Sequence, residues 1–283
     1  MGNWKMHKVC ISVFPLTMLM TLSSASLADE FTGCHSYVGQ QVSFSSTQDV
    51  LASLRKTPTM KGEFETTADF ESRKAAAFKD IPKLLVLPSI FEGKHISYDA
   101  DQQAMSVKSY ALSNLNTDYA GVFGYGTDFD GKIEFSRLYD NLDAVIYRSE
   151  KNVGQYSGEN AYGASRNVRK IDRRTVSIFE REGEYGEDLF PSKMTDEDGV
   201  DSIIGFVYDI PIEQAKLARD NWKSGYVVEL KSPYFTEGPV RHKGPSITRP
   251  TEINETLSVV IADIKCGIVT DSSSRVLLSE ATR

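Results

Sequence analysis

The sequence predicts an α+β fold built mainly of antiparallel β-sheet, with about three short helices. Three segments carry helix caps or helically spaced apolar residues, whereas about nine segments are rich in the branched and aromatic residues that favour strands. Most strand candidates are joined by short, turn-like connections. A doubly wound sheet needs a helical crossover between its parallel strands, so these short connections favour antiparallel pairing.

Three segments are expected to form helices: residues 44–58, 62–82 and 211–222. Hydroxyl side chains precede the first two and can accept hydrogen bonds from the free amides of a first turn, whereas Pro211 suits the start of the third. The expected caps are Ser46 and either Thr66 or Thr67. The apolar residues expected to share one side of each helix are Val50, Leu51 and Leu54; Phe70, Ala77 and Phe78; and Ile212, Ala215, Ala218 and Trp222.

The strand candidates alternate with turn signals along the rest of the chain. We expect a polar turn at Ala100-Asp101, a Pro/Gly-rich loop over residues 233–250 and a closing hairpin around the turn Asp271–Ser274. The candidates are KLLVLPSI, AMSVKSYAL (residues 104–112), GKIEFSRLY, LDAVIYRS, NVRKIDRRTVSIFERE, DSIIGFVYDI, GYVVELKS, ETLSVVIADIKCGIV and SRVLLSE.

The chain begins with the pattern of a secretory signal peptide. Lys5 and Lys8 precede an apolar run of 14 residues, and small residues at Ser26 and Ala28 form a cleavage site after Ala28. A membrane anchor is the alternative, but the run is shorter than the roughly 18–20 residues that span a bilayer. We therefore expect a periplasmic or secreted protein whose mature chain has no transmembrane segment.

The exported part, residues 29–283, is expected to form one α+β domain, with residues 184–202 as a weak internal boundary. The whole chain has a formal net charge of −7, and removal of two lysines with the signal peptide leaves −9. An acidic balance of this size argues against general binding to nucleic acid or to anionic membranes.

Two cysteines, Cys34 and Cys266, remain after the signal peptide is removed. An isolated pair in an exported protein most simply forms a disulfide. Such a bridge would close a very long loop and stabilise the protein by up to roughly 5 kcal/mol in the chain-entropy description. The alternative for Cys34 is lipidation within FTGC, but Phe31 and the two acidic residues before it fit a lipoprotein signal poorly.

The segment YGTDFDGKIEF, residues 125–135, has acidic residues and a glycine at spacings that suggest a calcium loop. With Gly131 at position 6 of an EF-hand loop, position 1 is Gly126 and position 12 is Arg137, where a bidentate carboxylate is required. The segment therefore predicts a hairpin turn instead. The acidic loop at residues 195–201 fails the same test; weak calcium binding is the alternative for both.

Two glycine-containing segments are expected to be structural. GVFGYG, residues 121–126, lacks the Gly-x-Gly-x-x-Gly order and no helix follows it, so we expect no nucleotide site there. SGENAYGASRNV, residues 157–168, predicts a turn or bulge that opens a strand. The alternative for this segment is a cleft lined by Glu159, Asn160 and Tyr162.

The sequence contains none of the common hydrolase signatures: Gly-x-Ser-x-Gly, His-Glu-x-x-His or a convincing Ser-x-x-Lys set. His35, His95 and His242 have no partner at metal-binding spacing, and each is expected to be a surface or capping residue. We expect no catalytic, cofactor-binding or metal-binding residues and no cofactor. Carboxylates that meet only in three dimensions stay open as an alternative.

One short segment, RNVRKIDRR at residues 166–174, reverses the acidic balance of the chain. A solvated strand face is the default expectation for such a segment, and a patch for an anionic partner, either an anionic polymer or an envelope protein, is the alternative. Its basic residues are Arg166, Arg169, Lys170, Arg173 and Arg174, and the segment VRHKG adds Arg241 and Lys243.

Three stretches, KGEFETTADFESRKAAA, YDAD…SYALSNLNTDYAGVFGYG and GENAYGA, form a pattern that resembles a family of bacterial secreted or envelope proteins with no assigned activity. The resemblance covers roughly residues 60–180. It implies a bacterial envelope location but names no chemistry, so it assigns no role to any residue.

The sequence thus predicts a bacterial periplasmic protein that acts by binding or by structural interaction. The alternative is an envelope hydrolase whose site combines carboxylates with a histidine. A deep cleft with convergent titratable groups would favour the enzyme, whereas a broad groove or exposed patch would favour the binding protein.

Overall fold

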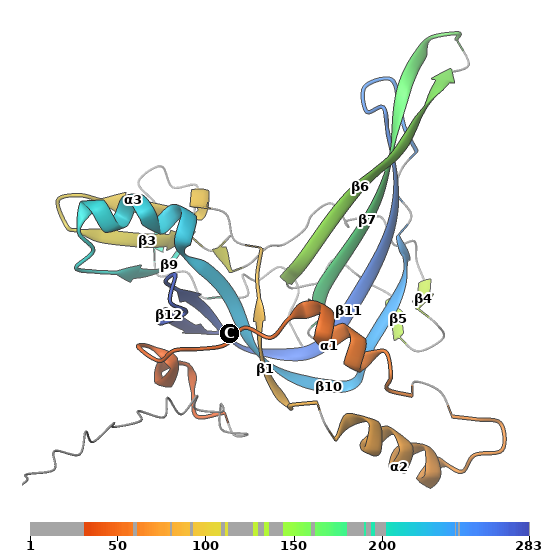
Figure 1. The fold of residues 1–283 in the computed structure, drawn as a ribbon, viewed down its shortest axis with the longest axis horizontal. Helices are drawn as coiled ribbons and strands as arrows, with labels where there is room; N and C mark the ends of the chain where they lie inside the picture. Colours follow the sequence, from red (N-terminus) through yellow and green to blue (C-terminus); the bar gives the residue numbers. More distant parts are fainter. Residues whose placement is uncertain are drawn as a thin grey trace, which may run out of the picture.

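The computed structural model of the chain contains three α-helices and twelve β-strands within the part that it describes (Figure 1). The predicted signal peptide, residues 1–28, and the segment 121–126 lie outside that part. The structure describes residues 31–58, 61–79, 81–90, 93–108, 111–112, 127–129, 133–135, 144–159, 162–179, 190, 194–195, 202–240, 242 and 244–282.

Short helices lie near the N-terminus and before the C-terminal strands. The α-helices are α1 (Thr47–Leu54), α2 (Thr67–Phe78) and α3 (Ile212–Asn221), and the 3₁₀ turns are η1 (Cys34–Tyr37) and η2 (Gly93–His95). The strands are β1 (Leu84–Pro88), β2 (Ile96–Asp99), β3 (Ala104–Lys108), β4 (Thr127–Phe129), β5 (Ile133–Phe135), β6 (Ala144–Glu159), β7 (Ser165–Phe179), β8 (Met194–Thr195), β9 (Ser202–Val207), β10 (Lys223–Val240), β11 (Thr251–Thr270) and β12 (Val276–Ala281).

The largest sheet has the order β1-β10-β11-β7-β6, and β12 also pairs with β11. A second sheet has the order β2-β3-β9-β8, and β4 and β5 form a separate pair. The α+β class is confirmed, but the large sheet is mixed, because β7 runs parallel to β11 over eleven residue pairs. The parallel pairing is possible because β8, β9, α3 and β10 lie between these two strands in the chain and provide the long connection it needs.

The predicted loop at residues 233–250 is wrong for its first part, because β10 continues as a strand to Val240. A register shift between Leu230 and Phe235, with Tyr234 at φ 75°, allows the strand to bend and continue along β11. Proline is tolerated where a strand lies at the edge of a sheet, and within the described residues β10 has no second partner strand beyond Leu230. Proline content was therefore a poor guide here.

Helix α1 is the predicted first helix, shortened to eight residues. The Ser46 hydroxyl accepts a hydrogen bond from the amide of Asp49 at 3.3 Å, which caps the first turn as expected. Val50, Leu51 and Leu54 are buried in the main core together with β1, β6, β7, β10 and β11. This packing fixes the C-terminal end of α1 over one face of the large sheet (Figure 1).

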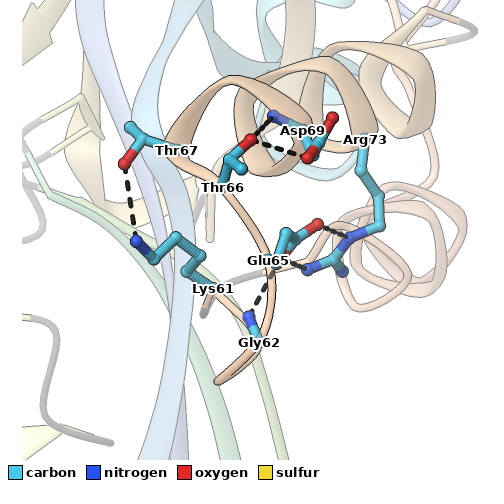
Figure 2. A network of polar contacts seen from close by, with 7 residues as sticks. All are labelled: Lys61, Gly62, Glu65, Thr66, Thr67, Asp69 and Arg73. Atoms are coloured by element: carbon cyan, nitrogen blue, oxygen red, sulfur yellow. Dashed lines mark hydrogen bonds and ion pairs between the residues drawn. The ribbon is translucent and has the colours of Figure 1, made fainter.

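Helix α2 is held by local contacts, because none of its residues is fully buried. Figure 2 shows the Thr66 hydroxyl accepting from the amide of Asp69 and donating to its carboxylate, while Glu65 receives two hydrogen bonds from Arg73. The bonds from Arg73, then that from the amide of Gly62, hold the pKa of Glu65 at about 2. Only the C-terminal end is anchored, where Phe78 stacks on Tyr234 at 3.8 Å.

Helix α3 packs with the predicted face except at its first residue. Ala215, Ala218 and Trp222 are buried, whereas Ile212 is 51% exposed. Ile212 begins the helix directly after Pro211 and lies beyond the region covered by the core. Ile212 is therefore the member of this apolar side that stays exposed, because it lies at the start of the helix.

The N-terminal segment covers the other face of the large sheet. A disulfide joins Cys34 to Cys266, as predicted, with their Cα atoms 5.6 Å apart. Around it, a second apolar cluster includes Tyr37, Val42 and Ile268. The predicted closing hairpin is also present, because β11 and β12 pair on either side of a turn in which the Asp271 carboxylate accepts from two backbone amides.

Candidate functional site: a polar pocket at the root of a three-stranded arm

Three strands extend beyond the core and form what we call the arm, defined as residues 150–159 of β6, 165–174 of β7 and 251–256 of β11. The β6–β7 hairpin, in green, runs away from the rest of the molecule in Figure 1. Every residue of the β6 part is exposed or half-exposed, and Val168 is the one buried residue in the β7 part. The turn predicted within residues 157–168 is present between β6 and β7.

The five basic residues of the candidate patch do not share one surface. Successive side chains of a strand point to opposite faces of the sheet. Arg166, Lys170 and Arg174 therefore lie on one face of the arm, and Arg169 and Arg173 lie on the other. We call the first of these the pocket face, because Arg174 lines a pocket there.

Two of the five cations are engaged by carboxylates. Lys170 lies 3.7 Å from Glu252 and 5.3 Å from the ring centre of Tyr156. Arg173 lies 2.7 Å from Glu150 on the neighbouring strand. By contrast, Arg166, Arg169 and Arg174 form no ion pair with any residue of the described chain.

Opposite the pocket face, the root of the arm contains a buried glutamate. Glu255 is 1% exposed, and its carboxylate accepts a hydrogen bond from Thr175 at 2.5 Å and lies 2.5 Å from Nε2 of His242. Arg173 approaches the same carboxylate at 3.5 Å. Burial of a carboxylate requires such partners, so these contacts join β7, β11 and the end of β10 at this point.

For two of the three histidines, which were expected to be surface or capping residues, the structure excludes the surface alternative. His242 is 13% exposed and belongs to the Glu255 cluster, and His95 is buried, so neither is a surface residue. Thr175 donates to the glutamate, not to the histidine. The cluster therefore differs from a nucleophile–histidine–acid relay, in which the hydroxyl contacts the histidine.

The pocket on the other face lies between the end of α1 and strands β6, β7, β10 and β11. Its volume is about 340 Å³. Most of its lining is polar, and three charged side chains from three separate elements reach it. The residues that matter here are Gln48, Arg55, Tyr147, Arg174, Glu237 and Ser258.

Each charged residue is positioned by a different part of the fold. Arg55 is the C-cap residue of α1, which the buried Leu51 and Leu54 hold against the sheet. Arg174 is the last exposed residue of β7 before that strand enters the core. Glu237 on β10 lies directly opposite Ser258 on β11 in the strand register.

Glu237 is the best-connected group in the pocket. Arg55 Nη2 and Ser258 Oγ both lie 2.5 Å from its Oε2 atom. Burial alone would raise the pKa of Glu237, but the hydrogen bonds from Arg55 and Ser258 and the charges of Arg55 and Arg174 outweigh it, so the pKa is lowered. Glu237 is therefore ionised at neutral pH, and the pocket carries two positive charges and one negative charge.

Sequence reasoning identified Arg174 but missed the pocket. No local pattern connects Arg55, Arg174 and Glu237, which come from distant parts of the chain. One usable signal was Pro58, which limits how far the predicted helix can extend and therefore places Arg55 near its C-terminal end. The register of β10 against β11 is a tertiary fact that no local signal supplies.

The other motifs do not add a site within the described residues. Strands β4 and β5 pair in antiparallel register, which confirms the hairpin predicted for residues 125–135, although the Asp130-Gly131 turn itself lies outside the description. Residues 196–201 of the acidic loop predicted at 195–201 also lie outside it. Among the described residues, no group of three His, Cys, Asp or Glu side chains is arranged to hold a metal ion.

None of the helices in the described part of the chain combines the length and apolar character that a bilayer crossing requires. Comparison of the chain with family models, with curated proteins and with solved structures finds no match in any of the three. The function is therefore argued from the geometry of the arm and the pocket.

Proposed function

We propose that this chain is an exported binding protein of the bacterial envelope, and that its arm contacts an anionic partner. The signal-peptide pattern supports export. The Cys34–Cys266 disulfide supports the same proposal, because such bonds persist mainly in oxidising compartments. The partner is an anionic polymer or the acidic surface of another envelope protein.

The observation that carries this proposal is the set of three arginines on β7 without an ion-pair partner in the described chain: Arg166, Arg169 and Arg174. They lie on a projecting element of a chain whose net charge is −7. A local positive region on an acidic protein directs an anionic partner to that region and away from the rest of the surface. Arginine also suits bidentate binding of carboxylate and phosphate groups.

The test is binding of fluorescein-labelled poly-L-glutamate to the mature, oxidised chain, followed by fluorescence anisotropy. Binding should weaken steeply as salt is raised, because exposed charges are screened. The double variant Arg166→Glu/Arg169→Glu should weaken binding by about 10-fold or more. The matched control is Lys79→Glu/Lys223→Glu, which makes the same charge change at exposed residues outside the arm and should cost less than about 2-fold.

Two results would contradict the proposal. One is the absence of salt-dependent binding to poly-L-glutamate and to dextran sulfate, a second anionic polymer. The other is an equal loss of affinity in the arm variant and in its control. Uncharged dextran is the reference polymer, and it should bind neither the parent protein nor the variants.

A second candidate function is an envelope hydrolase with a carboxylate and a histidine in its site. The observation that favours it is the contact between Glu255 and His242. If it is correct, the protein hydrolyses activated esters or glycosides and His242→Gln abolishes that activity at unchanged folding. If the cluster is structural, His242→Gln changes stability and no hydrolysis is detected in either protein.

A further inference from the structure

The charged residues of the pocket differ in whether they are paired with a residue of opposite charge. Arg55 and Ser258 both contact Glu237, so one guanidinium and the carboxylate are already paired. Arg174 lines the same pocket and forms no ion pair with a described residue, although its charge acts on Glu237. The pocket therefore retains a net positive charge that a monoanionic ligand would neutralise.

The rest of the lining can form hydrogen bonds with a polar ligand. Gln48, Tyr147 and Thr256 supply an amide and two hydroxyl groups around the charged side chains. A volume of about 340 Å³ lies at the small end of the range found for ligand sites, roughly 300–1,000 Å³. A small polar molecule fits these properties better than a lipid or an aromatic compound does.

We propose that the pocket binds a small monoanionic molecule that carries several hydroxyl groups, of the sugar-acid class, with its carboxylate on Arg174 and Arg55. This inference goes beyond the proposed function of the arm, because it assigns a ligand class to a separate pocket. Guanidinium groups bind carboxylates through paired, charge-assisted hydrogen bonds. The hydroxyl groups of the ligand would bond to Gln48, Tyr147 and Thr256.

Glu237 acts as a selectivity residue in this arrangement. Its negative charge leaves room for one anionic charge in the pocket and repels a second one. A carboxylate with one negative charge is therefore preferred over a phosphate monoester, which is mainly dianionic above its second pKa of about 6. Removing the charge of Glu237 without changing its shape should reduce this preference.

The experiment is isothermal titration calorimetry of the mature, oxidised chain with D-glucuronate, D-glucose and D-glucose 6-phosphate at neutral pH. Glucuronate should bind, glucose should bind at least about 10-fold more weakly, and glucose 6-phosphate should fall between them or below. Arg174→Gln and Arg55→Gln should each weaken glucuronate binding by about 10-fold or more. Glu237→Gln should strengthen binding of glucose 6-phosphate relative to glucuronate.

Two further variants keep the result interpretable. Arg174→Lys retains the charge and should restore part of the affinity, which a general loss of folding would not allow. Lys79→Gln, at an exposed lysine outside both the arm and the pocket, should leave glucuronate binding unchanged. The near-ultraviolet circular dichroism of each variant reports whether the fold is retained.

The outcomes separate this inference from the proposed function. If poly-L-glutamate binds the arm but glucuronate does not bind, or glucose binds equally well, the pocket assignment is overturned and the proposed function stands. If glucuronate binds and responds to Arg55→Gln while the polymer does not bind, the pocket assignment stands and the arm proposal fails. Equal effects of Lys79→Gln and Arg55→Gln on glucuronate binding also overturn the pocket assignment.

Discussion

Strand β11 passes through two regions of the molecule that differ in solvent exposure. From residue 257 to residue 270 it is buried almost throughout, with the main core on one face and the disulfide-linked N-terminal segment on the other over its last residues. From residue 251 to residue 256 it belongs to the arm and is largely accessible, with the exception of Glu255. One strand therefore supplies both the interior and an exposed surface.

The amino-acid composition of the two regions reflects this difference in burial. The buried part of β11 reads as a near-continuous apolar run, because both of its faces are shielded from water. The arm instead relies on backbone ladders, on the cross-strand pair of Arg173 with Glu150, and on the hydrogen bond from Tyr156 across β7 to Glu252. Substitutions should therefore be costly in the buried region and mild in the arm, which leaves the arm free to carry binding residues.

The largest expected effect is at Gly225 in the buried region. A Cβ atom there would overlap the carbonyl oxygen of Leu87 and the ring of Phe44. Gly225→Ala should therefore lower the free energy of unfolding by about 3 kcal/mol or more, because the backbone of β1 cannot move without breaking its ladder. The measurement is urea denaturation followed by circular dichroism.

The matched control for Gly225→Ala is Gly158→Ala in the arm. Its Cβ would lie 3.1 Å from a methyl group of Val168, a side chain that can shift. We expect a cost below about 1 kcal/mol. Similar costs at Gly225 and Gly158 would remove the contrast between the two regions.

The second effect concerns the disulfide, which closes the buried region only. Cys34→Ser/Cys266→Ser should lower the free energy of unfolding by about 2–3 kcal/mol. Because the arm lies away from the bridge, binding of poly-L-glutamate at a temperature where the variant is folded should be unchanged. A loss of polymer binding by the folded variant would show that the two regions are coupled.

The third effect tests the root of the arm. Glu255→Gln keeps the shape of the side chain but removes the charge that faces His242 and Arg173. We expect a loss of about 2 kcal/mol in the free energy of unfolding, because Arg173, which is largely buried, loses the charge of Glu255 as a counter-ion. Urea denaturation measures it, with Glu150→Gln as the exposed control, whose cost should stay below about 1 kcal/mol.

The smallest effect is a pH dependence in the buried region. The hydrogen bond from Lys83 lowers the pKa of Glu229 to about 2 from its ordinary value of 4.5; burial opposes this shift, and Lys265 and Lys231 reinforce it. A lowered acid pKa stabilises the fold above the ordinary pKa. This stabilisation is lost as the pH falls from 4.5 towards 2.

Glu229→Gln should therefore cost about 1 kcal/mol at neutral pH. The gap between variant and parent should close progressively below pH 4.5, where the parent carboxylate becomes protonated. Denaturation curves at a series of pH values measure this gap. A gap that is constant down to the acid limit would mean that ion pairing is not its cause.

Local signals were enough to predict several elements of this protein. The Ser46 cap, a cap at Thr66 or Thr67, the shared apolar face of α1 and the turn before β12 depend on residues close together in the chain. The Cys34–Cys266 bridge was predicted from the cysteine count and the expected export, since no other cysteine remains once the predicted signal peptide is removed. In each case, short-range chemistry or elimination leaves one simple arrangement.

Long-range register was decided by the tertiary structure alone. The parallel pairing of β7 with β11 depends on where a distant strand packs, so short connections elsewhere in the chain could not predict it. The same holds for β10, whose prolines suggested a loop until the edge position was known. Sequence alternation predicts that two faces exist, but not which elements cover them.

The candidate site follows the same division. The sequence by itself determined that Arg166, Arg169, Lys170, Arg173 and Arg174 form a basic segment. The tertiary structure decided that Arg173 is paired with Glu150, that Arg174 meets Arg55 and Glu237 in a pocket, and that His242 contacts Glu255. The physical reason is that charge is a property of each residue, whereas pairing and burial depend on neighbours that only folding brings within a few ångströms.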